Sequence, residues 1–91
     1  MATSEITKLP ITIQRTSKTV ALGANTDTTV SMSSVLSGTP KLLIVEGWAP
    51  TSTWATKLIV KQVNPATSTV YVRIDGSTAQ SYQIYVTAVY W

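Results

Sequence analysis

The sequence predicts an all-β fold, a single small antiparallel β-sandwich or jelly-roll-like domain of about seven strands. Apolar residues recur at alternate positions, and the residues between them are mostly Thr, Ser, Gln and Lys. No long segment keeps the apolar stripe of an amphipathic helix. Gly, Pro, Asn and Asp separate the apolar runs, and the length of 91 residues suits one hydrophobic core rather than two.

Alternating segments mark the expected strands, in which β-branched and aromatic side chains are frequent. Such side chains fit a pleated, half-buried surface better than a helix. The segments lie at 11–15, 19–24, 28–32, 42–48, 55–63, 69–75 and 82–90. Turn-forming residues fall between them, for example at 24–27 and 64–67. We expect the last four strands to form a meander.

The first ten residues differ from the rest of the chain. They are polar and end in Pro10, so residues 1–10 are expected to be an N-terminal arm or the end of a linker, and 11–91 the β-sandwich domain. They lack the basic region and apolar core of a signal peptide. The longest aliphatic run, 42–45, is far shorter than the about 20 residues that span a bilayer. No membrane insertion is expected.

The last expected strand is apolar on both faces, unlike the cleanly alternating strand before it. On its second face, Tyr85, Val89 and Trp91 interrupt the polar residues. A strand with two apolar faces is buried on both, whereas a domain of this size offers one core. We therefore expect Tyr85, Val89 and Trp91 to form an oligomer interface or to meet the N-terminal arm. The alternative is that they cover the rim of a monomer.

The absence of Cys and His excludes several kinds of functional site. The chain has no Cys and no His, which removes disulfides, thiol nucleophiles and the commonest metal ligand and general base. No metal site and no cofactor are expected. A domain this small usually needs a supplement to its core, and with disulfides excluded the expected supplement is association with copies of itself. The predicted partner is therefore another copy of the same chain, in a homo-oligomer.

Enzyme activity and nucleic-acid binding are not expected. The only acidic residues are Glu5, Asp27, Glu46 and Asp75. A glycosidase needs two carboxylates about 5–10 Å apart, and Glu46 with Asp75 is the one pair on strands that would approach each other. Their simpler roles are a solvent-facing strand position and a turn, so no catalytic residue is assigned. The net charge of +3 comes from dispersed basic residues, which argues against a nucleic-acid partner.

Two tryptophans form the candidate glycan or receptor contact. Trp48 and Trp54 flank the segment 49–53, so both indoles would project at one end of the domain. The C–H faces of sugars lie well on aromatic rings. The alternative, which the usual burial of tryptophan favours, is that the pair caps the core at the end of a hairpin.

Two stretches carry a resemblance to small bacteriophage virion modules. SKTVALGANTD at 17–27 and the aromatic-rich YQIYVTAVYW at 82–91, in a Ser- and Thr-rich chain without Cys, resemble tail-fibre tips, receptor-binding and baseplate proteins, head fibres and capsid decorations. The resemblance runs from 17 onward, lies in general sequence character, and transfers no functional residue by position. It implies a trimeric β-sandwich on the surface of a phage particle, with other virion proteins and a host-surface glycan as partners.

Three functions remain as hypotheses. The first is a non-enzymatic virion structural protein, an oligomeric tail-fibre or receptor-binding module for host attachment. The second is a capsid decoration or head-fibre protein anchored by its N-terminal arm. The third is a carbohydrate-binding module in which Trp48 and Trp54 form the platform.

Overall fold

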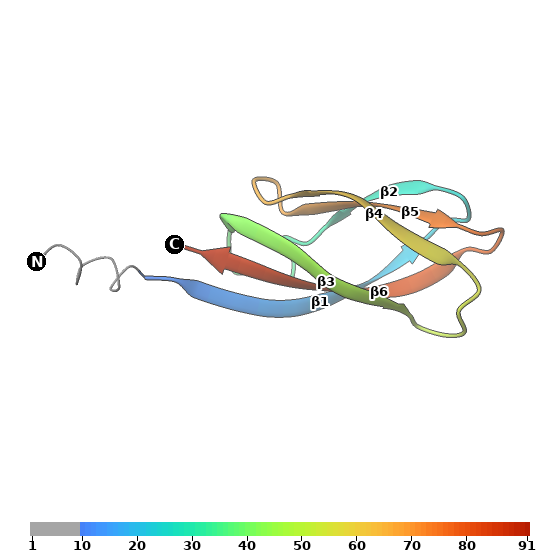
Figure 1. Cartoon of the computed structure of the whole chain (residues 1–91), viewed down its shortest axis with the longest axis horizontal. Helices are drawn as coiled ribbons and strands as arrows, with labels where there is room; N and C mark the ends of the chain where they lie inside the picture. The colour runs from blue at the N-terminus through green and yellow to red at the C-terminus, as the bar shows by residue number, and fades with distance from the viewer. Residues whose placement is uncertain (1–9) are drawn as a thin grey trace, which may run out of the picture.

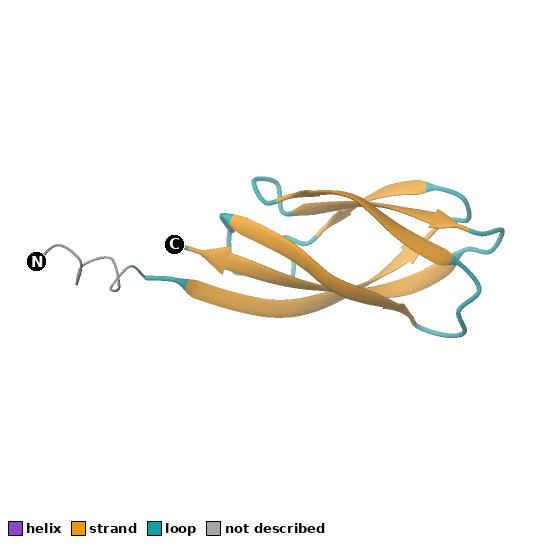
Figure 2. Ribbon diagram, in the orientation of Figure 1, coloured by secondary structure: helices purple, strands orange, loops and turns teal. Residues whose placement is uncertain are grey.

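The protein is all-β, as the sequence predicts. The computed structural model describes residues 10–91, which form two three-stranded antiparallel sheets (Figure 1). The strands are β1 (Thr12–Leu22), β2 (Asp27–Ser31), β3 (Leu42–Pro50), β4 (Lys57–Asn64), β5 (Thr69–Asp75) and β6 (Gln80–Tyr90). These residues contain no helix, and so none that would cross a membrane (Figure 2). Of the expected arm only Pro10 is described; it is exposed and precedes β1.

The number of strands differs from the expectation. Most of the segments 11–15 and 19–24, expected as two strands, falls within the single strand β1, which ends before residues 23 and 24. The described residues therefore form six strands rather than seven. Every residue of β1 pairs with a residue of β6 without a register shift. The polar residues 16–18 do not interrupt the strand, because β6 is equally long and supplies a partner for the backbone of each.

The strand order also differs from a meander. One sheet has the order β1-β6-β3 and the other β2-β5-β4. The chain therefore changes sheet at every connection except the β4–β5 hairpin. The reason is that β5 and β6 each carry one completely buried face, and each becomes the central strand of its own sheet.

The hydrophobic core lies between the two sheets and is built mainly by their central strands. Alternate residues of β5 and β6 point into it, and those at most 1% exposed are Val70, Val72, Ile74, Tyr82, Ile84, Val86 and Ala88. Met32, which follows β2, is equally buried. Each edge strand adds one buried core residue: Leu22 at the end of β1, Val30 of β2, Leu43 of β3 and Leu58 of β4. The core uses one face of each sheet, so the other face is left outward.

Two turns at one end of the molecule are tied together. Asn25, in the turn after β1, has a positive φ of 48°, and its side-chain oxygen accepts a hydrogen bond of 3.0 Å from the Gly76 amide in the turn after β5. At Gly76 φ is 149°, and a Cβ there would lie 2.7 Å from the Thr56 side chain. Only glycine fits this position, so the turn is specified by its sequence.

Candidate functional site

The two outward faces of the sheets have opposite character. Among the described residues, the exposed large apolar side chains are Ile11, Ile13, Leu42, Ile44, Trp54, Tyr85 and Trp91. Within the strands, all of them belong to β1, β3 or β6, and none belongs to the sheet β2-β5-β4. The exposed apolar side chains of the strands therefore lie on the sheet β1-β6-β3, in contrast to the other sheet.

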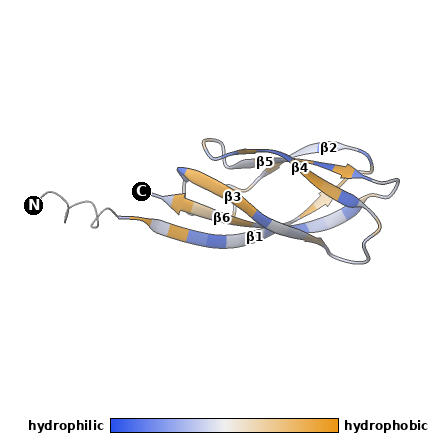
Figure 3. Cartoon of the chain, viewed as in Figure 1, coloured by the Kyte–Doolittle hydropathy of each residue, from blue (hydrophilic) through white to orange (hydrophobic). Residues whose placement is uncertain are grey.

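Cross-strand register gathers these side chains. Leu42 of β3 pairs with Val89 of β6, which pairs in turn with Ile13 of β1, so the three form one row across the sheet. Two further rows place Ile44 beside Thr87, and Tyr85 beside Gly47. We call Ile13, Leu42, Ile44, Tyr85 and Val89 the outer apolar face. Figure 3 shows the hydrophobic colour on β1, β3 and β6 near the end of the molecule that carries the C-terminus.

A groove of about 580 Å³ adjoins this face at the register shift between Val45 and Gly47 of β3. Nothing lies within 4 Å of the place a Gly47 Cβ would occupy, so the missing side chain helps to keep the groove open. Tyr85, Arg15 and Glu46 line it. Glu46 accepts a hydrogen bond of 2.7 Å from the Thr87 hydroxyl. Arg15 and Glu46 thus place opposite charges on one surface, and neither belongs to an ion pair within residues 10–91.

The residues of the predicted interface lie on or beside this face. Tyr85 is 42% exposed, Val89 is half-buried in the first apolar row, and Trp91 follows β6 and is 61% exposed. Sequence reasoning missed Ile13, Leu42 and Ile44. The signal for two of them was the aliphatic run at 42–45, which a strand divides between its two faces.

The two candidate tryptophans occupy different environments. Trp48 lies within β3, opposite Ile84, and packs partly buried against the core. Trp54 lies in the connection between β3 and β4, is 69% exposed, and meets the buried Tyr82 ring edge-on with 6.5 Å between centroids. Trp54 therefore keeps an accessible surface, whereas Trp48 contributes mainly to packing.

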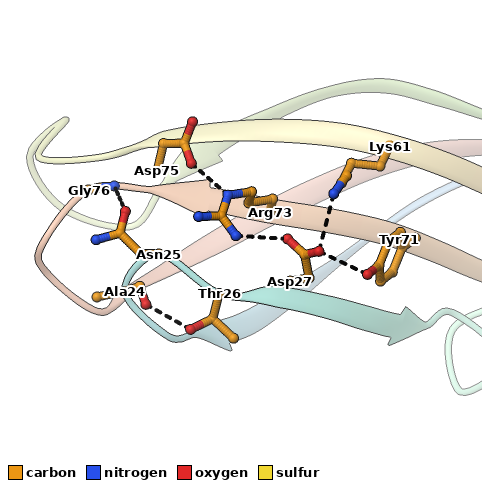
Figure 4. Close-up of polar contacts among 9 residues, drawn as sticks. All are labelled: Ala24, Asn25, Thr26, Asp27, Lys61, Tyr71, Arg73, Asp75 and Gly76. Carbon is orange, nitrogen blue, oxygen red and sulfur yellow. Dashed lines mark hydrogen bonds and ion pairs between the residues drawn. The ribbon is translucent and has the colours of Figure 1, made fainter.

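A network of charged and phenolic side chains covers the outer face of β2-β5-β4. The Asp27 carboxylate of β2 accepts hydrogen bonds from Lys61 at 3.1 Å, Tyr71 at 2.9 Å and Arg73 at 3.1 Å (Figure 4). Arg73 also donates to Asp75 at 2.8 Å. Because Lys61 comes from β4 and the other donors from β5, Asp27 links all three strands of the sheet.

These contacts shift the ionisation of the network. The hydrogen bond from Arg73, then those from Lys61 and Tyr71, lower the pKa of Asp27 from 3.8 to about 2. The hydrogen bond to Asp27 raises the pKa of both the Tyr71 hydroxyl and the Arg73 guanidinium. Each group is thereby held in the form that suits its partner: Asp27 ionised, Tyr71 protonated and Arg73 charged.

The two carboxylates expected on strands do not come together. Glu46 lies on β3 and Asp75 at the end of β5, in different sheets, and each is bonded to a neighbour on its own sheet. Among residues 10–91 there is no cluster of three or more carboxylates that would hold a metal ion.

No family model matches the chain, and comparisons with curated proteins and with solved structures found no match either.

The Asp27 network predicts a specific pH dependence. Because the pKa of Asp27 is lowered on folding, its contribution to stability is present above 3.8 and is lost as the pH falls through about 2. Asp27→Asn should lower the melting temperature at neutral pH, and the difference from the wild type should shrink across that range. Thermal unfolding followed by circular dichroism measures it. Glu46→Gln, a matched change on the other sheet, should retain the acid-dependent loss. A constant difference at every pH would contradict the prediction.

Proposed function

We propose that this chain is a non-enzymatic structural module, a β-sandwich that assembles with copies of itself through the outer apolar face. We further propose that it belongs to a bacteriophage particle, as a tail-fibre or receptor-binding module for host attachment. The observation that carries the assembly is the contrast between the sheets: the exposed apolar strand residues lie on β1-β6-β3, and the charged network lies on β2-β5-β4. A concentrated apolar patch on one side of a small protein is typical of an interaction surface.

A second copy of the chain is the occupant that the face fits. Arg15 and Glu46 stand on the same surface with opposite charges and without an ion pair among the described residues. In a symmetric assembly, Arg15 of one protomer would meet Glu46 of the next, so the surface complements itself. The apolar row would exclude water around that contact, and aromatic Tyr85 is of the type enriched in interfaces.

Small size supports the same proposal. With 91 residues and no Cys, the chain has no disulfide to supplement its core. Fully burying one aliphatic side chain contributes about 1.5–3 kcal/mol relative to leaving it exposed. Three aliphatic side chains, Ile13, Leu42 and Ile44, are 41–55% exposed in the single chain. Burying them in an interface between copies would contribute part of that free energy to association.

The virion assignment is supported by the resemblance of the sequence to small phage modules, which also leads us to propose a trimer. An attachment module works through geometry: several copies on one axis present the same loops to a host surface, and many weak contacts become firm adhesion. In the head-fibre alternative, the anchor is the N-terminal arm, and residues 1–9 of that arm lie outside the described part of the chain.

A charged residue introduced on the outer apolar face should dissociate the assembly into monomers. We expect the wild type to be an oligomer at micromolar concentration and Val89→Glu or Ile44→Glu to be monomeric, because each buries an unpaired carboxylate in the interface. Sedimentation velocity measures the mass. The control is Ile59→Glu, the same class of change on the outer face of the other sheet, which should remain oligomeric. A monomeric wild type would disprove the proposal.

Charge exchange tests which surfaces meet. Arg15→Glu and Glu46→Arg should each weaken association, since like charges would face each other across the interface. The double variant, which restores opposite charges with their places exchanged, should recover most of the lost affinity. Sedimentation over a concentration series gives the dissociation constants. If the two effects simply add, Arg15 and Glu46 do not meet between protomers.

The particle assignment predicts the genetic setting. The reading frames on either side of the gene should encode capsid, portal or tail proteins. Sequencing the flanking DNA checks this. Flanking genes for cellular metabolism on both sides would argue against the virion while leaving the assembly proposal intact.

A further inference from the structure

The outer face of β2-β5-β4 carries a small polar groove beside the Asp27 network. Its volume is about 270 Å³, and it is lined by Thr29, Gln62, Asn64, Thr69 and Tyr71. Register explains the grouping: Tyr71 on the central strand pairs with Thr29 on one side and with Gln62 on the other. An aromatic ring therefore lies between a hydroxyl and an amide, each presented by a different strand.

Tyr71 is held in place at this position. Its hydroxyl donates to Asp27 at 2.9 Å, and the Lys61 ammonium lies 5.5 Å from the centroid of its ring. Lys61 reaches the ring because it is the extra residue at the register shift between Val60 and Gln62. A ring anchored at both its hydroxyl and its face loses little further freedom on binding a ligand.

Some of the polar side chains that line the groove already make hydrogen bonds within the chain, and others do not. Asn64 accepts a hydrogen bond from the Ala66 amide, and the Thr69 hydroxyl bonds to Thr67. The exposed side chains of Thr29 and Gln62 make no hydrogen bond with any other residue of the described chain. An amide and a hydroxyl each donate and accept, so the two available groups match the neighbouring hydroxyls of a sugar.

Charge decides the class of ligand. Lys61, which lies over the Tyr71 ring, and Arg73 are the cations of the Asp27 network. Asp27 pairs with both, and Asp75 pairs with Arg73. Two positive and two negative charges cancel in this network, so the network itself offers no excess positive charge to a phosphate, a nucleic acid or an acidic sugar. The remaining lining is hydroxyl and amide with one aromatic ring, which does not suit a lipid chain.

We infer that this groove is a binding site for a neutral sugar, with Gln62 and Thr29 as the hydrogen-bonding residues and Tyr71 as the fixed wall. Its volume lies just below the about 300 Å³ at which pockets for drug-sized ligands begin, so it suits one sugar ring and weak affinity. The site does not require assembly. If the proposed assembly holds, the groove stays accessible on the opposite sheet, and several copies would multiply the weak affinity.

A sugar titration tests the site. The probes are methyl glycosides of glucose, galactose, mannose and N-acetylglucosamine, added singly at millimolar concentration to the full chain while amide NMR shifts are recorded. We expect at least one to give saturable shifts confined to the neighbourhood of Thr29, Gln62 and Tyr71. Gln62→Ala should weaken that binding about tenfold or more, because one sugar hydroxyl loses its partner. Thr29→Ala is an independent second variant.

Two control variants distinguish sugar binding at the groove from the proposed assembly. Gln83→Ala removes an amide from the opposite sheet and should leave the affinity unchanged. The monomeric Val89→Glu variant should bind a free monosaccharide as the wild type does, and should lose only the tighter binding to a sugar-coated surface. No saturable shift with any probe, shifts centred on Trp54, or unchanged binding in Gln62→Ala would each overturn the site.

Discussion

The pairing of β6 along its whole length is the interaction on which the rest of the structure depends. This strand has a partner on each edge, β1 and β3, and one of its faces fills the core. Its two edges and one face are thereby satisfied inside the chain. Its other face remains outward with Tyr85 and Val89, and the register of β6 with its neighbours brings Ile13, Leu42 and Ile44 beside them. The apolar surface is a direct result of that register.

The two sheets differ in the side chains that cover their outer faces. Both have a buried inner face, and each needs something to hold its strands together on the outside. The sheet β2-β5-β4 uses Asp27, whose carboxylate joins donors from β4 and β5 to β2. The sheet β1-β6-β3 has longer strands and carries apolar side chains there. One outer face is therefore bonded within the chain, and the other carries the apolar side chains through which we propose assembly.

Local alternation was enough to predict much of the fold. The bounds 69–75 agree with β5, because Val70, Val72 and Ile74 alternate with polar residues between clear turn signals. The break expected within β1 was wrong, since polar residues stay extended when a long neighbour pairs with them. The Asp27 network was missed because Asp27 lies far from Lys61 and Arg73 along the chain, and only the register of the folded sheet brings them together.

The register shifts in β3 and β4 have a consequence for solubility. Each interrupts the ladder on an edge strand, and a bulged edge is a poor template for a strand from another molecule. β1 is an edge strand without a bulge, and its Lys18 side chain donates a hydrogen bond to the Ser31 carbonyl of the other sheet. A strand from another molecule that paired with β1 would bury this charged side chain, which is unfavourable. Open-ended growth into fibrils is thus disfavoured at three of the four sheet edges, which leaves the outer apolar face as the surface through which we propose that copies of the chain associate.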